Sequence, residues 1–202
     1  IYRHEIGNFD KKDELIFEEK GNAFTVSIGI SSDEKYYFIN TSDHNTSEQY
    51  YFNSNEENPT PKLIIKREKG IIYNVNSWNG KFYNHTNKGA EDFKIDVCDN
   101  LENQNWRTFL PGRDGVLIHG LTFLKNWIIR GETSNALDKL FALNTLTNIE
   151  EELIFSDEIV YVPGVSLTQK NRDTNEVYLS YSSPKTPSRV YKYNLETKSK
   201  EL

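Results

Sequence analysis

Short apolar and aromatic runs, separated by polar turns, recur along this chain at a nearly constant distance. One set of candidate strands reads KYYFINTSD from Lys35, KFYNHTNKG from Lys81, NWIIRGETS from Asn126 and EVYLSYSSP from Glu176, with spacings of 46, 45 and 50 residues. A second set reads QYYFNSN from Gln49, FKIDVCD from Phe93, KLFALNT from Lys139 and RVYKYNL from Arg189, with spacings of 44, 46 and 50. Because two independent landmarks drift together, the chain is built from units with a period near 45 residues.

Each unit contains further candidate strands on either side of these two. Predicted first strands are Phe24–Ile30, Ile72–Trp78, Val116–Phe123 and Val160–Leu167, and predicted fourth strands are Pro61–Glu68, Asn105–Pro111 and Glu151–Glu158. Residues 1–7 and 13–19 read as the third and fourth strands of an earlier unit. Asn79-Gly80 is the strongest hairpin turn signal in the chain.

Four short strands in each unit of 40–50 residues predict an all-β fold, a β-propeller of four-stranded antiparallel blades. A β-sandwich is the alternative, but its strands alternate between apolar and polar positions because one sheet face meets water. The runs YYFI, WII, LIIK and VYVPGV are continuous, which favours blades packed on both faces. Residues 135–146 carry the nearest approach to a helical period, and their place in the repeat favours a strand.

The expected organisation is one partial propeller domain, residues 1–202, with about four to four-and-a-half blades. A blade end covers residues 1–19, and the blades cover residues 20–68, 69–113, 114–158 and 159–202. The first unit lacks its inner strands, and the chain begins with Ile1 in mid-pattern. We therefore expect a piece of something longer, an arc rather than a closed ring. Open strand edges invite pairing, so we expect this piece to self-associate or to be marginally stable.

Composition narrows the functional classes. The formal net charge is -6, which disfavours nucleic-acid binding. No run approaches the roughly 18 apolar residues of a membrane span, and no signal peptide is visible, so no membrane partner is expected. The single cysteine, Cys98, cannot form an internal disulfide, which predicts a cytoplasmic protein and a small buried side chain.

No motif for catalysis or cofactor binding is recognisable. The Gly-x-Ser-x-Gly elbow of serine hydrolases is missing, and metal-ligand and phosphate-loop spacings are missing too. Glu150–Glu152 reads as a solvated loop. His119 lies on a first strand, where it either faces a channel or is a hydrogen-bonded structural histidine. We therefore expect no catalytic, cofactor-binding or metal-binding residue in this chain, no cofactor, and no activity of the chain alone.

Two segments resemble a known family. LIFEEKGNAFTVSIGISSDEKYYFINTSDHNTSEQYYFN, residues 15–53, resembles a propeller blade of oligopeptidase B-like members of the prolyl oligopeptidase family. VYLSYSSPKTPSRVYKYNLETKSKEL, residues 177–202, is similar to the last blade of that family, with a Y-S-S-x-x-T-P-x-x-x-Y pattern. The middle, including RDGVLIHGLTFLKNWIIRGE from Arg113, fits in layout. The chain departs at Glu196-Thr197-Lys198, where the family has a Thr-Gly turn.

The resemblance implies part of the seven-bladed propeller of a two-domain serine endopeptidase that cleaves short peptides after Lys or Arg. In such proteins the partner is an α/β-hydrolase domain of the same parent chain, which carries the Ser, Asp and His, and the propeller limits access to short peptides. An acidic wall would attract basic peptides. Two alternatives stay open: a stand-alone propeller that serves as a protein-interaction scaffold, and a glycan-acting propeller such as a sialidase, which needs an arginine cluster. A Gly-x-Ser-x-Gly elbow in the parent gene would decide for the peptidase.

Overall fold

The computed structural model describes residues 1–7, 9, 12–154, 158 and 160–202. It divides into two compact units, Ile1–Pro111 and Gly112–Leu202, each of which is described by itself. The strands of the first unit are β1 (Tyr2–Arg3), β2 (Glu14–Leu15), β3 (Thr25–Ile30), β4 (Tyr36–Ser42), β5 (Ser47–Asn53), β6 (Lys62–Leu63), β7 (Tyr73–Trp78), β8 (Lys81–Thr86), β9 (Lys94–Cys98) and β10 (Arg107–Leu110). Those of the second are β11 (Val116–Leu124), β12 (Trp127–Ser134), β13 (Leu137–Asn144), β14 (Ile149–Glu152), β15 (Val162–Leu167), β16 (Glu176–Ser182), β17 (Arg189–Asn194) and β18 (Lys200–Glu201).

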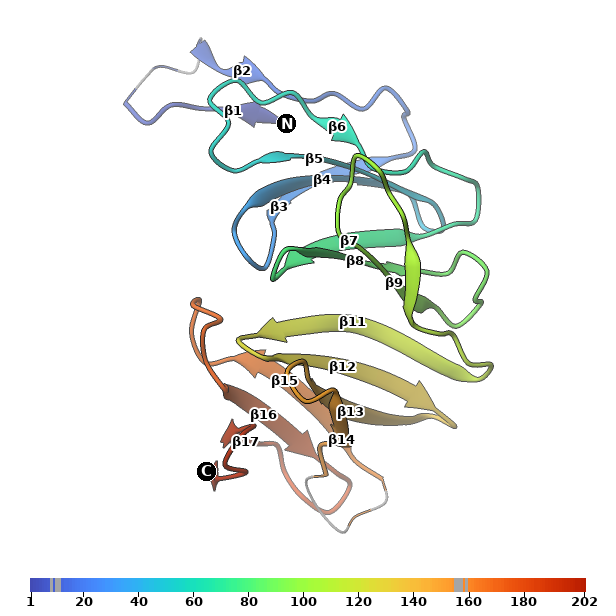
Figure 1. Cartoon of the computed structure of the whole chain (residues 1–202), viewed down its shortest axis with the longest axis vertical. Helices are drawn as coiled ribbons and strands as arrows, with labels where there is room; N and C mark the ends of the chain where they lie inside the picture. Colours follow the sequence, from blue (N-terminus) through green and yellow to red (C-terminus); the bar gives the residue numbers. More distant parts are fainter. Residues whose placement is uncertain (8, 10–11, 155–157, 159) are drawn as a thin grey trace. The chain divides into compact units, whose positions relative to one another are not determined.

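Every sheet is an antiparallel meander in which strands adjacent in sequence pair in space (Figure 1). The first unit holds the two-stranded sheet β1-β2 and the four-stranded sheets β3 to β6 and β7 to β10. The second unit holds the four-stranded sheets β11 to β14 and β15 to β18. Four consecutive four-stranded meanders confirm the predicted all-β, partial-propeller fold. The exact blade boundaries stay predictions.

The predicted first, second and third strands agree with the structure within a few residues. The helical alternative at residues 135–146 is wrong, because β13 pairs with β12 along its whole length, from Leu137 opposite Ser134 to Asn144 opposite Trp127. The turn before β13 reverses the chain through Asn135 and Ala136, with φ of 51° and 61°. Asn79 and Gly80 form the predicted tight turn, with φ of 50° and 72°.

Three fourth strands differ from the prediction, and the first of them is β2, which covers only Glu14–Leu15 of the predicted residues 13–19. β6 has only two residues, Lys62 and Leu63, because Ile65 leaves the ladder and exchanges hydrogen bonds with the Tyr73 hydroxyl. β14 begins at Ile149, so Glu150–Glu152 form a strand and not the predicted solvated loop. Their carboxylates are paired with Arg130, Lys198 and Lys139, respectively. Residues 155–157 of the predicted strand lie outside the described residues.

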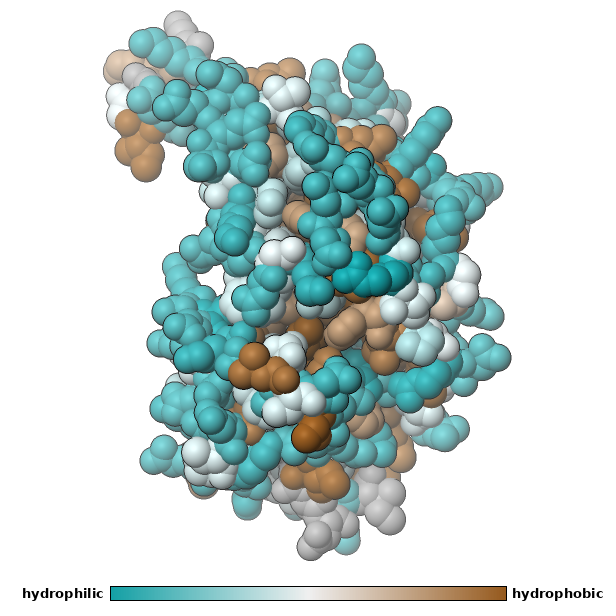
Figure 2. All heavy atoms as spheres, in the orientation of Figure 1, coloured by the Kyte–Doolittle hydropathy of each residue, from teal (hydrophilic) through white to brown (hydrophobic). Residues whose placement is uncertain are grey.

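The middle strands β4 and β12 are buried on both faces, as their continuous apolar runs YYFI and WII predicted, whereas β16 alternates, with Tyr178 exposed between buried Val177 and Leu179. In β12 the four residues from Trp127 to Arg130 are all buried, and in β4 both Phe38 and Ile39 are buried. The prediction was wrong for VYVPGV, since Val160 and Val162 are 56% and 60% exposed. In β15, therefore, one face is exposed at Val162 and Ser166, and the other face is partly buried. Hydrophilic side chains occupy most of the face in view in Figure 2.

Within the first unit, the side chains of β5 complete the free edge of β7. The Ser47 hydroxyl donates to the Tyr73 carbonyl at 2.9 Å and accepts from the Tyr73 N–H at 2.7 Å. The Gln49 amide does the same for Val75, donating from Nε2 at 3.1 Å and accepting at Oε1 at 2.8 Å. Gln49 and Val75 are each 1% exposed. Because buried backbone groups need partners, these two polar side chains hold one blade against the next.

The turn between β3 and β4 is a second polar junction with β7. The Ser32 N–H donates to Asn76 Oδ1 at 2.9 Å, and Asn76 Nδ2 donates to the Ser32 hydroxyl at 3.0 Å. The Ser77 hydroxyl donates to Asp33 Oδ2 at 2.8 Å. Polar residues of this turn therefore serve packing between blades as well as chain reversal.

Candidate functional site

The strand directions in the first unit define two ends, each with its own loops. β5 and β7 run parallel, because Ser47 meets Tyr73 and Gln49 meets Val75. The loops that follow β3, β5, β7 and β9 therefore share one end, and they comprise residues 31–35, 54–61, 79–80 and 99–106. The opposite end carries residues 16–24, 43–46, 64–72 and 87–93.

The first of these ends is rich in carboxylates. Its loops contain Asp33, Glu34, Glu56, Glu57, Asp99 and Glu102, and a single cation, Lys35. Asp99 is paired with Arg107 at 2.9 Å, and Glu102 lies 3.5 Å from Lys62. Among the described residues, the other four carboxylates have no ion-pair partner within 4 Å. We call this surface the acidic end. Lys and Arg nearly balance Asp and Glu in the loops of the opposite end.

A cavity of about 290 Å³ opens at the acidic end. Tyr36, Tyr51 and Phe82 form its aromatic wall, and Asp99, Glu102 and Lys62 lie at its polar side. The rings of Tyr36 and Phe82 pack with centroids 5.1 Å apart. The hydrogen bond from Arg107 lowers the pKa of the Asp99 carboxyl, which therefore stays ionised in weak acid. Aromatic faces beside carboxylates suit the aliphatic stem and cationic head of a Lys or Arg side chain.

The four first strands, β3, β7, β11 and β15, contain no Asp, Glu, Lys or Arg. The acidic wall expected from the sequence is therefore absent from these strands, and at the acidic end the carboxylates without an ion-pair partner lie in loops 31–35 and 54–61. Sequence reasoning missed this distribution because the net charge alone does not distinguish strand from loop.

His119 is the one histidine on a first strand, and it is hydrogen-bonded. It lies at an irregularity in the β11–β12 register, between Ile118 and Leu121, and is exposed. Its Nε2 is 2.7 Å from the Thr133 hydroxyl, which in turn donates to Asp138. Because the Thr133 proton is directed to Asp138, the histidine Nε2 donates. These two hydrogen bonds hold the His119 ring in place, as expected for a hydrogen-bonded structural histidine.

Cys98 is buried, as predicted, with 0% of its surface exposed. Burial raises the pKa of its thiol to about 11, so the thiol is protonated at neutral pH and unsuited to nucleophilic chemistry. Cys98 packs among the buried hydrophobic residues of the first unit, where it fills space in the core.

Two arginines, the half-buried Arg67 and the buried Arg130, each bind two carboxylates. Arg67 donates to Glu48 at 2.7 Å and to Glu19 at 2.5 Å, with its guanidinium 4.1 Å from the Phe24 ring centroid. In the second unit Arg130 binds Glu132 and Glu150 and stacks on Phe141. Each guanidinium is satisfied by carboxylates of its own unit, unlike the free arginine cluster that a sialidase site needs. Arg130 is in the middle of a strand, an exception to the strand-end positions of most arginines.

In the part of the chain that the structure describes, no three His, Cys, Asp or Glu side chains are grouped as a metal site would require. A separate search of these residues for a long apolar helix able to cross a membrane also found none.

Consecutive four-stranded antiparallel meanders are the architecture of part of a β-propeller. The pattern that describes the N-terminal β-propeller domain of prolyl oligopeptidase matches residues 1–202, and the chain belongs to this family. It is 30% identical to Protease 2 of Moraxella lacunata, over 100% of the chain and 29% of the relative. It is 25% identical to Dipeptidyl aminopeptidase BI of Pseudoxanthomonas mexicana, over 98% of the chain and 27% of the relative.

Solved structures agree on the fold. Oligopeptidase B from Trypanosoma brucei, a closed form with covalently bound antipain, matches with a TM-score of 0.90 and 23% identity, over 99% of this chain and 30% of that one. Oligopeptidase B from Leishmania major matches with a TM-score of 0.88 and 17% identity, over 98% and 29%. The chain thus spans less than a third of the length of these relatives.

Proposed function

We propose that this chain is part of the non-catalytic propeller of an oligopeptidase B-like serine endopeptidase. The propeller admits short peptides to the catalytic centre, and the parent enzyme cleaves them after Lys or Arg. The observation that carries the proposal is the match of the propeller-domain pattern to all 202 residues. The α/β-hydrolase domain of the parent chain is the proposed partner and carries the catalytic residues. The buried, unpaired Cys98 supports a cytoplasmic protein.

The acidic end supplies the proposed electrostatic part of this function. Carboxylates without cationic partners create a negative potential that raises the local concentration of basic peptides. Glu56 and Glu57 lie in the same loop, and Glu34 lies in the neighbouring turn. A peptide with Lys or Arg is attracted to this end, whereas a neutral peptide is not.

The test measures kcat/KM of the parent peptidase on short Arg-containing and neutral peptides. In the double variant Glu56→Gln/Glu57→Gln we expect a few-fold lower kcat/KM for the Arg peptide, through KM, and no change at high salt, where the Debye length is about 3 Å. The matched control, Glu18→Gln/Glu91→Gln, removes two charges from the opposite end and should leave kcat/KM unchanged.

Two results would overturn the proposal. A parent protein that does not cleave after Lys or Arg would end the endopeptidase assignment. Equal losses in both double variants would end the role of the acidic end alone. The 202-residue chain by itself should hydrolyse neither peptide. If the isolated chain did hydrolyse one of them, and a serine-directed inhibitor abolished that activity, the catalytic residues would lie within this chain.

A further inference from the structure

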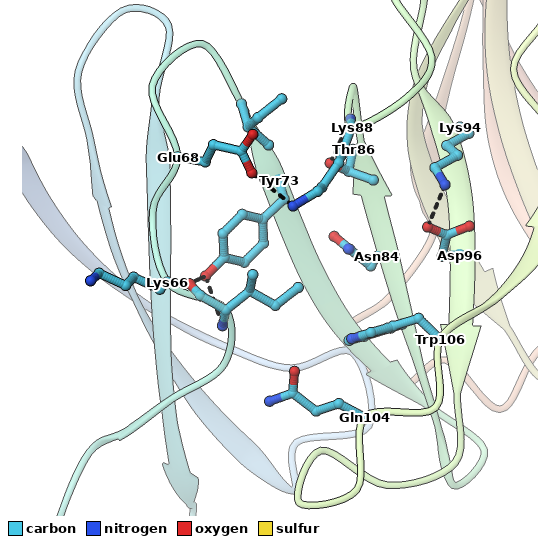
Figure 3. Close-up of a pocket in the computed structure, with 12 residues that line it drawn as sticks. Lys66, Glu68, Tyr73, Asn84, Thr86, Lys88, Lys94, Asp96, Gln104 and Trp106 are labelled. Carbon is cyan, nitrogen blue, oxygen red and sulfur yellow. Dashed lines mark hydrogen bonds and ion pairs between the residues drawn. The ribbon is translucent and has the colours of Figure 1, made fainter.

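A second cavity, of about 360 Å³, lies within the first unit and is distinct from the one at the acidic end (Figure 3). Tyr73, Asn84, Thr86, Lys94 and Asp96 of β7, β8 and β9 form one wall. Residues of three connecting segments, 64–72, 87–93 and 99–106, form the rest: Ile65, Lys66, Glu68, Ile71, Lys88, Gln104 and Trp106. A volume near the lower end of the range for ligand pockets suits a small molecule.

The cavity exists because β6 ends after two residues. A longer β6 would continue along β5, but the chain instead turns at Ile65 to bond the Tyr73 hydroxyl. Gln104 spans part of the opening by donating to the Ile64 carbonyl at 2.5 Å. The part of β8 and β9 that contains Asn84 and Asp96 therefore faces the cavity.

Two polar atoms inside this cavity lack partners. Asn84 is 4% exposed, and its Oδ1 is buried without a hydrogen bond among the described residues. Trp106 Nε1 is likewise buried without one. In Figure 3 the Trp106 indole reaches into the hollow with its nitrogen directed between Asn84 and Gln104. An unpaired buried polar group costs about 1–3 kcal/mol, so an unpaired acceptor and an unpaired donor in one hollow point to an absent partner.

The missing partner must offer both a donor and an acceptor. An N–H to Asn84 Oδ1 and a C=O to Trp106 Nε1 are together the two polar groups of an amide. Ile65, Ile71 and the ring of Tyr73 supply an apolar lining for the atoms on either side. A metal ion would leave Trp106 Nε1 unpaired, because a metal ion binds only acceptors.

Both signs of charge are present around the amide-binding pair. Lys94 is bonded to Asp96 at 2.9 Å, and this pair is largely buried. Lys88 is bonded to Glu68 at 2.7 Å, and this pair is exposed. Each pair can exchange its internal contact for a charged end of a ligand, so a zwitterion with an ammonium and a carboxylate is accommodated.

We propose that this cavity binds a short zwitterionic peptide, of two or three residues, whose peptide group bridges Asn84 Oδ1 and Trp106 Nε1. The site is independent of the acidic end and of the proposed peptidase function. A chain of ordered waters is the competing occupant, because a water can also accept from Trp106 and donate to Asn84.

The test is an NMR titration of the ¹⁵N-labelled 202-residue chain with two probes of equal length. Glycylglycine has four backbone atoms between its ammonium nitrogen and carboxylate carbon, and 5-aminopentanoate has four methylenes there and no amide. The indole cross-peak of Trp106, assigned from Trp106→Phe, should shift with glycylglycine at millimolar concentration and not with 5-aminopentanoate. The indole cross-peaks of Trp78 and Trp127 are internal controls.

Two substitutions separate binding from folding. Asn84→Leu removes the acceptor at nearly constant volume and should weaken glycylglycine binding about fivefold to tenfold, the loss of one hydrogen bond. Trp106→Phe removes the N–H donor and keeps an aromatic ring at this position. We expect the same loss of glycylglycine affinity, measured from the shift of the Thr86 backbone amide cross-peak. Asn74→Leu places the same change on an exposed position of β7 and should leave binding intact.

The proposal fails if glycylglycine up to tens of millimolar leaves the Trp106 cross-peak in place, which is the outcome for a water-filled cavity. It also fails if both probes shift the cross-peak equally, because the ion pairs would then bind the ligand without the amide. Unchanged affinity in both Asn84→Leu and Trp106→Phe would overturn it as well.

Discussion

Replacing Gln49 with leucine tests whether polar side chains hold neighbouring blades together. The substitution keeps the approximate volume, so it creates little cavity. It removes the donor to the Val75 carbonyl at 3.1 Å and the acceptor for the Val75 N–H at 2.8 Å. Val75 lies on the free edge of its sheet and is 1% exposed, so water cannot replace the lost partner.

The cost follows from the two backbone groups left without partners. Each unsatisfied buried group costs about 1–3 kcal/mol, and the added apolar surface of leucine returns about 1–2 kcal/mol. We therefore expect a loss of up to about 5 kcal/mol, centred near 2–3 kcal/mol, a large part of the 5–15 kcal/mol that stabilises ordinary domains. Gln169→Leu is the matched control, since Gln169 is exposed, and it should change stability by less than about 0.5 kcal/mol.

The assay is equilibrium urea unfolding, in which the midpoint should fall while the slope m stays constant. Amide hydrogen exchange adds a local readout, because the Val75 N–H should lose protection in Gln49→Leu and keep it in Gln169→Leu. If the two variants have equal midpoints, or if Val75 stays protected, the side chain of Gln49 does not complete the edge of β7 and the reasoning is wrong.

Two further predictions concern a turn and an ion cluster. Ala136→Gly should stabilise the chain by about 1 kcal/mol in urea unfolding, because Ala136 has φ of 61° and glycine adopts this conformation without strain. A loss of stability would contradict a strained turn. In the same assay Gly80→Ala should be destabilising, because Gly80 has φ of 72°. For Glu48, burial favours the neutral acid, but hydrogen bonds from Arg67 and Tyr50 outweigh it and lower the pKa. Its stabilising effect is therefore full above the unfolded pKa of about 4.3 and is lost as the pH falls below it, so Glu48→Gln should be less stable than the parent at pH 7 and the difference should shrink at pH 3. A difference that is the same at both pH values would rule out this linkage.

The sequence predicted the strands best where local chemistry and the repeat agree. Asn79-Gly80 carries its own turn preference, and the run from Lys35 lies at the repeat distance from the run at Lys81, so both strands were found. The prediction failed at Glu150–Glu152, where three adjacent acids resemble a loop. Their strand is stable because Arg130 and Lys139, both on other strands, neutralise two of them.

The candidate sites were beyond prediction from local sequence. No ligand-binding motif marks Asn84 or Trp106, since an asparagine in a strand and a tryptophan before one are ordinary residues. They become a candidate pair because β6 ends early, and β6 ends early because a hydroxyl eight residues further on bonds Ile65. Similarly, the sequence gives the net charge, but only the strand directions place the loops 31–35 and 54–61 at one end.

By itself, the sequence determined the class of fold, the order of the strands and the family. The fold class and the strand order follow from continuous apolar runs, turn residues and a repeat near 45 residues, and the family follows from the resemblance of residues 15–53 and 177–202, all of which can be read along the chain. Tertiary structure alone decided which polar groups meet across blades and which stay unpaired. Gln49 and Val75 are 26 residues apart, and hydrogen bonds of that range depend on where every intervening strand ends, which no local pattern specifies.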